Sequence, residues 1–303
     1  MPSSKSRRKS SRPNVGIDVQ HFTDLVAIGQ GRTSIVYRAR HIPSGKDVAL
    51  KVSRSRDLSA ASVDEFMRDT RSLGQLTGHP NVVAVYTSMR TDDNRLAVCL
   101  ELCRYSLADR AATNGPMNPV LATGIGVKIA GALESAHHIG MTHNDVTPRN
   151  VLVRTNGQPA LGDFGLARFK TRMQNEDGSV LNFSSLHVAP ELLEGADSSV
   201  AADVYGLAST MYELIAGRAP FARAESESTA SVALRILSDP ARANDAIPAP
   251  LFAVIADALA KDPAARPDSA AEFADRLNTI AKEMSWPRVG SFVSPRDTAG
   301  VLG

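Results

Sequence analysis

Two short blocks near the middle of the chain constrain its fold and chemistry more than any other feature. Residues 141–153 read MTHNDVTPRNVLV and supply Asp145 and Asn150, and residues 162–168 read GDFGLAR and supply Asp163. The eight residues between the blocks, RTNGQPAL, suit a short hairpin. Two carboxylates and a carboxamide on loops around such a hairpin can hold a divalent metal ion on the phosphates of a nucleotide and orient a hydroxyl for in-line attack.

Two motifs earlier in the chain fit the same chemistry. Residues 28–37 read IGQGRTSIVY, and glycine at positions 29 and 31 lets backbone N–H groups approach phosphate oxygens without a Cβ in the way. A tight hairpin turn is the alternative explanation of this glycine pair. In the strand predicted over 48–52, alternation separates Lys51 from the apolar face. A strand lysine is commonly a solvated edge residue, but the motifs on either side favour a phosphate contact.

In this order along the chain, these motifs resemble those of the protein kinase family, and within it the soluble, eukaryotic-like (Hanks-type) bacterial Ser/Thr kinases of actinobacterial type. The resemblance covers about residues 22–281. It implies an α+β, bilobal fold with a small antiparallel β lobe that carries one regulatory helix, and a larger, mainly helical lobe. The implied divisions are an N-lobe over about 22–100, a hinge at 101–103 and a C-lobe over 104–281.

The resemblance also implies a role for each motif residue. Asp145 would orient the acceptor hydroxyl and accept its proton, and Lys51 would hold the α- and β-phosphates of ATP. Asn150 and Asp163 would hold Mg²⁺. Further nucleotide contacts are expected from Ile28, Gly29, Gln30, Gly31, Arg32, Thr33, Ser34, Ile35, Val36, Ala49, Glu101 and Cys103.

Four positions depart from the family pattern. Ser34 replaces the third glycine, which should stiffen the loop. Asp69 stands where the regulatory helix normally has the glutamate that pairs with the lysine, and it reaches about 1.3 Å less far. Asn144 replaces the arginine that normally receives an activation-segment phosphate, so activity should not depend on that switch. Thr147 replaces a lysine donor to the transferring phosphoryl group, and losing such a donor costs about 100- to 1,000-fold in rate.

Arg149 offers a replacement for the missing donor. It follows Asp145 by four residues, the offset of the corresponding arginine in receptor tyrosine kinases, and we expect it to supply the cation at the γ-phosphate. An ordinary surface arginine beside Pro148 is the alternative. The same offset leaves tyrosine or dual specificity open, although the rest of the chain favours serine or threonine. Autophosphorylation is expected, and the candidate acceptors are Thr171, Ser179, Ser184 and Ser185.

Helices and supporting residues follow from periodicity and from the resemblance. A capping box at Ser62–Glu65 predicts the start of one helix. Three- and four-residue apolar steps predict a long helix over 120–140, and a nearly apolar stretch predicts a buried helix that begins at Asp203. The resemblance implies that Asp203 hydrogen-bonds the catalytic-loop backbone and that a Glu191–Arg266 ion pair anchors the activation segment.

The ends of the chain differ from its middle in composition. Five basic residues precede the first acidic residue, Asp18, so residues 1–19 are expected to form a disordered basic tail. That tail could contact nucleic acid or an anionic surface, or only solubilise the protein. Residues 282–303 are expected to form a loose extension, with Trp286 against the C-lobe. Strand residues 95–102 are expected to be buried.

Cysteine usage and hydropathy point to one compartment. Cys99 and Cys103 are the only cysteines, and four strand residues separate their Cα atoms by about 13 Å, too far for a disulfide. Both are expected to be buried. Since the chain shows neither a signal peptide nor an apolar run long enough to span a membrane, we expect a cytoplasmic protein.

Two other functions remain open. A pseudokinase scaffold that binds nucleotide without transfer would explain Ser34, Asp69, Asn144 and Thr147, but the four central residues of phosphoryl transfer are all present. A small-molecule kinase of the aminoglycoside phosphotransferase type shares the fold, but those enzymes lack the Ala-Pro-Glu motif and the late arginine found here. Protein substrates are therefore expected. The sequence leaves the substrate, the activating signal and the oligomeric state open.

Overall fold

A computed structural model describes residues 19–31, 33–56, 59–164, 186–224 and 227–294, apart from the side chains of Ser62, Glu65 and Asp69. By its internal contacts the chain divides into two compact units. The first comprises residues up to Val63 together with Tyr86–Leu102, and the second comprises Asp64–Val85 together with the chain from Cys103 onward. The segment 64–85 was predicted to belong to the N-lobe, but its contacts group it with the helical unit.

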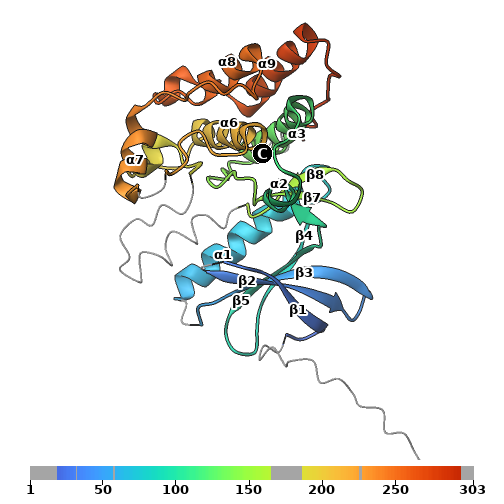
Figure 1. Ribbon diagram of the computed structural model, residues 1–303. Helices are drawn as coiled ribbons and strands as arrows, with labels where there is room; N and C mark the ends of the chain where they lie inside the picture. The colour runs from blue at the N-terminus through green and yellow to red at the C-terminus, as the bar shows by residue number, and fades with distance from the viewer. Residues whose placement is uncertain (1–18, 32, 57–58, 165–185, 225–226, 295–303) are drawn as a thin grey trace, which may run out of the picture. The chain divides into compact units, whose positions relative to one another are not determined.

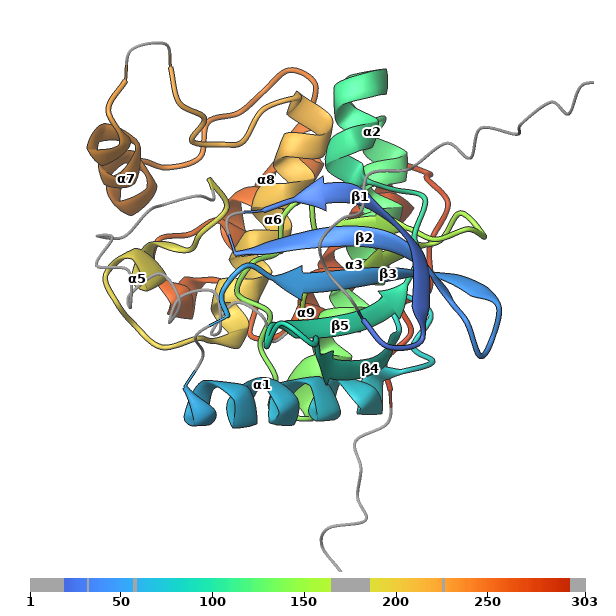
Figure 2. The same ribbon diagram turned by 90° about the horizontal axis from the view of Figure 1, so that it is seen from below.

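The first unit is built on an antiparallel sheet with the strand order β1-β2-β3-β5-β4. Figure 1 labels the five strands, and their order can be followed in Figure 2. The strands are β1 (Phe22–Gln30), β2 (Ser34–His41), β3 (Lys46–Ser53), β4 (Val85–Arg90) and β5 (Leu96–Glu101). Strands β2 and β3 pair without interruption, whereas β1 and β2 pair with two register shifts. The predicted strands over 48–52 and 95–102 are thus confirmed.

One face of this sheet carries the core of the first unit. Val48, Leu50 and Val52 of β3 are buried there, as alternation predicts. Val19 and Phe22 join the same cluster. Val19 was assigned to the disordered tail, but its side chain is only 3% exposed, so the folded part of the chain includes this residue. Residues 1–18 lie outside the described residues.

The second unit is mainly helical. Its helices are α2 (Leu107–Asn114), α3 (Pro119–His138), α5 (Pro190–Leu193), α6 (Val200–Ala216), α7 (Thr229–Ser238), α8 (Ala249–Ala258) and α9 (Ala270–Glu283), with 3-10 turns η1 (Gly74–Leu76) and η2 (Pro263–Ala265). A small sheet of β6 (Tyr105–Ser106), β7 (Val151–Val153) and β8 (Pro159–Leu161) carries the predicted hairpin. The long helix predicted over 120–140 is confirmed as α3, capped by the Asn118 side chain.

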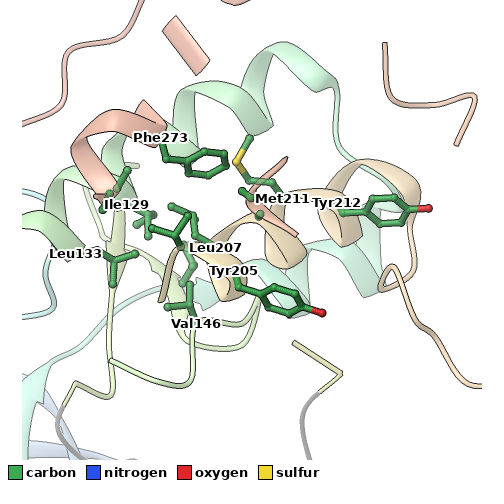
Figure 3. Packing of buried hydrophobic residues seen from close by; sticks show 14 of the residues in the cluster. Ile129, Leu133, Val146, Tyr205, Leu207, Met211, Tyr212 and Phe273 are labelled. Atoms are coloured by element: carbon green, nitrogen blue, oxygen red, sulfur yellow. The ribbon is translucent and has the colours of Figure 1, made fainter. Parts of the chain in front are cut away.

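The core of this unit lies between α3, α6 and α9. Figure 3 shows part of it, with the labelled side chains Ile129, Leu133, Val146, Tyr205, Leu207, Met211, Tyr212 and Phe273. The helices approach closely because small residues face their neighbours. A Cβ on Gly126 of α3 would lie 2.4 Å from the Met211 sulfur, and one on Gly206 of α6 would lie 3.2 Å from Val146 Cβ. The catalytic loop therefore rests directly on α6.

Two helices begin earlier than the sequence indicates. Helix α1 spans Ala60–Leu73, and the Ser59 carbonyl accepts the hydrogen bond from Val63 N. Ser62 lies inside the first turn, so the predicted capping box is wrong; two serines three positions apart are equally good caps by sequence. Helix α6 begins at Val200, because the Ser199 hydroxyl caps Ala202 N. The predicted start at Asp203 is three residues too late.

The end of the chain is more ordered than expected. Residues 282–294 of the predicted loose extension complete α9 and then pack back on the second unit, with Trp286 partly buried against its core. Hydrogen bonds join Val289 to Asn278, and Ser294 to Ser135. Residues 295–303 lie outside the described residues. Within the described part of the chain, the helices are too short or too polar to cross a bilayer.

Candidate active site

The loop that carries Asp145 is anchored by a buried carboxylate. Asp203, fully buried on α6, accepts hydrogen bonds from the backbone N–H groups of His143 (2.8 Å) and Asn144 (2.6 Å). His137 Nε2 lies 2.8 Å from the same carboxylate. The predicted contact between Asp203 and the catalytic-loop backbone is confirmed. Since bonds to an ionised acceptor are short and strong, this end of the loop is fixed to the core.

His143 joins the two sequence blocks. Its Nδ1 accepts a hydrogen bond from Asp145 N (3.2 Å), so Nε2 carries the proton and donates to the Gly162 carbonyl (2.8 Å). The buried ring also meets the Phe164 ring edge-on, with 4.6 Å between centroids. The sequence contains His143 as part of a motif, but its bridging role was missed because it depends on where Gly162 lies.

Three of the predicted site residues come together through this framework. Asn150 Nδ2 donates to the Asp145 carbonyl (2.7 Å) and to Asp145 Oδ2 (3.1 Å). Gly162 N donates to the Asn150 carbonyl (2.8 Å), which places Asp163 one residue from that contact. Asp163 has a left-handed backbone (φ 66°), a conformation that non-glycine residues adopt rarely and that gathers at functional sites.

The chemistry of Asn150 and Asp163 fits a magnesium ion. Because the Asn150 amide N–H groups point at Asp145, its carbonyl Oδ1 is the side-chain atom suited to a cation. Asp163 supplies carboxylate oxygens. Magnesium prefers such oxygen ligands and commonly combines one or two protein groups with the phosphates of its substrate.

The departures in the catalytic loop have structural explanations. Asn144 adopts a left-handed backbone (φ 60°), which asparagine tolerates better than most residues, and its Nδ2 donates to the Thr142 hydroxyl. Thr147 is buried, and its carbonyl accepts hydrogen bonds from Asn150 N and Val151 N. Arg149 is exposed, in contrast to its neighbours Thr147 and Pro148.

The first unit carries the predicted phosphate loop at the tip of the β1–β2 hairpin. A hydrogen bond from Gly31 N to the Ser34 carbonyl (2.8 Å) closes this turn, so the tight-turn interpretation of the glycine pair is confirmed and the phosphate contact stays a prediction. A Cβ on Gly29 would lie 3.8 Å from Val36, and one on Gly31 would lie 3.5 Å from the Ser34 carbonyl. Packing therefore does not require either glycine, and the close approach of their backbone to phosphate stays a prediction. Arg32 lies outside the described residues.

Lys51 lies on β3, with Val36 of β2 and Val98 of β5 as its cross-strand neighbours. Its side chain is buried, so the alternative of a solvated edge lysine is wrong. Ala49 is also buried on β3, and Glu101 ends β5. Asp69 lies on α1, but its side chain is outside the described part, so its pairing with Lys51 stays a prediction.

The two cysteines differ in burial. Neither forms a disulfide, as predicted, and burial raises the pKa of the Cys99 thiol to about 11. Cys103, at the predicted hinge, is only partly buried, so the expectation that both would be buried is wrong for it.

The predicted Glu191–Arg266 ion pair is confirmed. Two parallel hydrogen bonds of 2.7 Å join the guanidinium to the carboxylate, and Arg266 also donates to the carbonyls of Ala201, Ala260 and Lys261. A second contact holds the same segment and was missed: His187 bridges Ser209 Oγ and Glu213 Oε2, at 2.8 Å each. Thr171, Ser179, Ser184 and Ser185 lie outside the described residues.

The chain is similar in sequence to a known protein family and to named relatives. The family described as "Protein kinase domain" matches residues 22–276. Serine/threonine-protein kinase PknK of Mycobacterium tuberculosis is 34% identical over 280 residues, covering 91% of this chain and 25% of that protein. Serine/threonine-protein kinase PkaA of Streptomyces coelicolor is 33% identical over 296 residues, covering 91% of this chain and 52% of that protein.

A solved structure shows the same fold. The crystal structure of the Mycobacterium tuberculosis PknI kinase domain, determined on a cysteine-to-alanine mutant, superimposes with a TM-score of 0.66 at 28% identity, covering 88% of this chain and 98% of that one. The chain thus spans about a quarter of PknK and about half of PkaA, but nearly all of an isolated kinase domain.

Proposed function

The chain belongs to the protein kinase family, and on that basis we propose that it is an ATP- and Mg²⁺-dependent kinase that transfers the γ-phosphoryl group to serine and threonine hydroxyls of proteins. The names of PknK and PkaA, both serine/threonine-protein kinases, support this choice of acceptor. We also propose that the protein acts in the cytoplasm, where ATP is abundant and cysteines such as Cys99 and Cys103 stay reduced.

One observation carries the proposal. Asp145, Asn150 and the residue before Asp163 are joined by direct hydrogen bonds, although Asp163 lies 18 positions after Asp145 in the sequence. A purely structural loop has no need for two carboxylates and a carboxamide on backbone segments joined in this way, whereas phosphoryl transfer depends on positioning and charge neutralisation.

Each residue has a distinct proposed task. The Asp145 carboxylate, oriented by Asn150 Nδ2, orients the acceptor hydroxyl and accepts its proton. Asn150 and Asp163 hold Mg²⁺, which neutralises charge on the phosphates when bound. Lys51 holds the α- and β-phosphates. Backbone N–H groups of the loop over residues 28–36 approach the phosphates, while Ala49, Glu101 and Cys103 contact the nucleobase side.

Arg149 is proposed to donate to the γ-phosphate in place of the missing lysine. Its exposure supports this role, because Thr147 at the usual position is buried and engaged through its backbone. Arg149→Ala should lower turnover by about 100- to 1,000-fold with little change in ATP affinity. Unchanged turnover would eliminate this assignment. The matched control is Arg242→Ala, at an exposed position of the same unit.

Activity is proposed to be independent of a phosphate–arginine switch, and the kinase is proposed to phosphorylate itself. Asn144 cannot form an ion pair with a phosphate, and its side chain and backbone are engaged by Thr142 and Asp203. Phosphatase-treated protein should therefore phosphorylate a peptide substrate at an undiminished initial rate. A lag that disappears after preincubation with ATP would contradict this.

The proposed function is tested by incubating the protein with Mg²⁺ and labelled ATP, followed by mass spectrometry of modified residues. We expect phosphoserine or phosphothreonine, and none with Asp145→Asn, a substitution of nearly the same size. Label in the Asp145→Asn sample would indicate a contaminating kinase. Nucleotide binding without transfer by the unmodified chain would instead make the protein a pseudokinase.

A further inference from the structure

The segment after α9 returns along the helical unit as an ordered strap, which we define as residues 286–294. Ser285, directly before the strap, has a left-handed backbone (φ 57°). Its N–H donates to the Lys282 carbonyl, and the N–H of Trp286 donates to the Ala281 carbonyl. These two bonds form a Schellman motif, which ends the helix and reverses the chain. The C-terminus of α9 therefore sets the direction in which the strap leaves the helix.

Specific contacts then hold the strap on α9 and α3. Asn278 of α9 bonds both backbone groups of Val289, through Oδ1 to its N–H (3.3 Å) and through Nδ2 to its carbonyl (3.2 Å). At the far end, Ser294 N donates to Ser135 Oγ of α3 (2.9 Å), and His138 Nδ1 lies 3.2 Å from the Ser294 carbonyl. These bonds satisfy backbone groups at both ends.

A glycine on α3 makes room for the middle of the strap. A Cβ on Gly131 would lie 2.4 Å from the Phe292 carbonyl oxygen and 3.2 Å from its N, closer than real Cβ contacts allow. One on Gly124, two turns earlier on the same helix, would lie 3.2 Å from Val289. Because glycine in a helix interior is about 1 kcal/mol less favourable than alanine, Gly131 weakens α3 while it seats the strap.

The strap also contacts the turn at His79–Val83, which follows α1. His79 Nδ1 accepts a hydrogen bond from Asn81 N (3.0 Å), so its Nε2 carries the proton and donates to the Phe292 carbonyl (3.1 Å). The His79 and Phe292 rings meet edge-on at 5.0 Å between centroids. One residue of the strap thus fixes the orientation of His79.

From this turn, hydrogen bonds lead to Asp163. Asn81 Nδ2 donates to the Pro159 carbonyl (2.7 Å), Leu161 N donates to the Asn81 carbonyl (2.8 Å), and Val83 N donates to the Leu161 carbonyl (3.0 Å). Strand β8 is therefore paired with the turn that the strap holds. Gly162 and Asp163 follow directly after β8.

We propose that the strap is an intramolecular positioning element: it holds the His79–Val83 turn and, through β8, sets the position of Asp163. Anything that displaces residues 286–294, such as a segment that follows them or a partner that binds Phe292, then weakens metal–nucleotide binding and lowers phosphotransfer. The regulatory part of this inference rests on the proposed function. The hydrogen bonds that link the strap to β8 through the His79–Val83 turn do not depend on it.

A pair of glycine substitutions tests the proposal on the full chain. Gly131→Ala places a methyl group in the strap's seat while it favours the helix, and Gly290→Ala adds the same methyl within the strap, where nothing lies within 4 Å. Hydrogen exchange is measured over 286–294, 79–83 and 159–164. For Gly131→Ala we expect exchange in all three segments to rise roughly three- to tenfold, as for the loss of one hydrogen bond, and no change for Gly290→Ala.

The same variants separate the strap from the proposed function. If residues 286–294 exchange faster in Gly131→Ala while 79–83 and 159–164 exchange as before, the strap does not position the turn or β8. If residues 286–294 also exchange as before, the strap does not depend on its packing against Gly131. If Gly131→Ala does not fold, Phe292→Ala, which removes only the ring contact, should still loosen residues 79–83. A His79→Ala/Gly131→Ala double variant should exchange no faster over 159–164 than the faster single variant. Both substitutions break the same series of contacts, from the strap through His79 to β8, so their effects should not add. These exchange results hold even if the chain transfers no phosphate.

Discussion

The loop around Asp145 and the glycine hairpin of β1 and β2 serve the same proposed substrate, yet they are built in opposite ways. The catalytic loop is bonded through its backbone to the buried Asp203 and, through His143, to Gly162. The hairpin has two register shifts, its Ile28 side chain is 52% exposed, and its glycines have space around them. Acid, base and metal ligands must keep fixed geometry, whereas a loop that covers phosphates must be able to adapt.

This difference predicts that substitutions in the anchored region affect stability or turnover strongly, and that substitutions in the hairpin affect nucleotide affinity mildly. The expected effects below run from the largest to the smallest.

Glu191→Ala should destabilise the helical unit most. It leaves the fully buried Arg266 guanidinium without its carboxylate, and breaking a buried pair costs about 3–5 kcal/mol. The matched control is Asp257→Ala, which removes the exposed ion pair with Arg276 and should cost about 0.5 kcal/mol. Urea denaturation measures both. Equal losses would show that the Glu191–Arg266 pair is not a buried anchor.

Asp163→Asn should lower kcat/KM by about 100- to 1,000-fold, because the proposed metal ligand loses the charge that would neutralise the metal-bound phosphates. Asparagine tolerates the left-handed backbone at this position, so the thermal midpoint should stay close to that of the unmodified protein. Asp245→Asn, at an exposed position, serves as the control. A loss of less than about threefold would remove Asp163 from the metal site.

Asp203→Asn should cost about 1–3 kcal/mol of unfolding free energy, because an amide group then faces the N–H donors of His143 and Asn144. Turnover should fall with it, since the loop loses its anchor. The exposed Asp197→Asn should change neither quantity. Normal stability combined with normal turnover would mean that the loop is held by other contacts.

Gly31→Ala should leave stability within about 0.5 kcal/mol, because the added Cβ makes ordinary contacts with Ser34, at 3.5 Å from its carbonyl oxygen and 3.9 Å from its Oγ. It should raise the KM for ATP about three- to tenfold, the effect of losing one backbone contact to phosphate, and leave kcat nearly unchanged. A large loss of kcat would contradict the idea that the hairpin adapts while the catalytic loop does not.

The smallest effect concerns pH. Burial lowers the pKa of His79 from its usual 6.5, and the Phe292 carbonyl partly opposes that shift. As the pH falls, His79 therefore takes up a proton in the unfolded chain before it does so in the folded chain. The contribution of His79 to the free energy of unfolding is full above about pH 6.5 and decreases below that value. A charged residue outside the turn, Arg154, contacts it by donating to the Pro80 carbonyl (3.0 Å).

His79→Gln isolates this contribution, because every other titrating group is shared between the two proteins. The difference in thermal midpoint between unmodified protein and His79→Gln should shrink as the pH is lowered from 7.5 toward 5.5. A difference that stays constant over this range would show that His79 does not titrate differently on folding.

Local patterns predicted a large part of this structure. The family resemblance gave the fold class, three- and four-residue apolar steps gave the helix α3, and residue alternation gave the strand around Lys51. The assignments of Asp145, Asn150 and Asp163 stay predictions. The ion pair between Glu191 and Arg266, 75 positions apart, was expected only from the family resemblance.

What escaped prediction depends on tertiary contacts. Ser59 and Ser62 are equally good caps in sequence, so the sequence does not decide which of them precedes α1. The strap over 286–294 has no apolar periodicity of its own; its order comes from Asn278, Ser135 and a seat at Gly131. Gly124 and Gly131 lie two helical turns apart in the sequence, but the sequence does not indicate that residues 286–294 pack against them.

The most direct test is calorimetric titration of the unmodified chain and of Asp163→Asn with ATP, with and without Mg²⁺. The account predicts that Mg²⁺ tightens ATP binding to the unmodified chain and has little effect on Asp163→Asn. Binding that is absent, or that is equally tight without Mg²⁺, would contradict it.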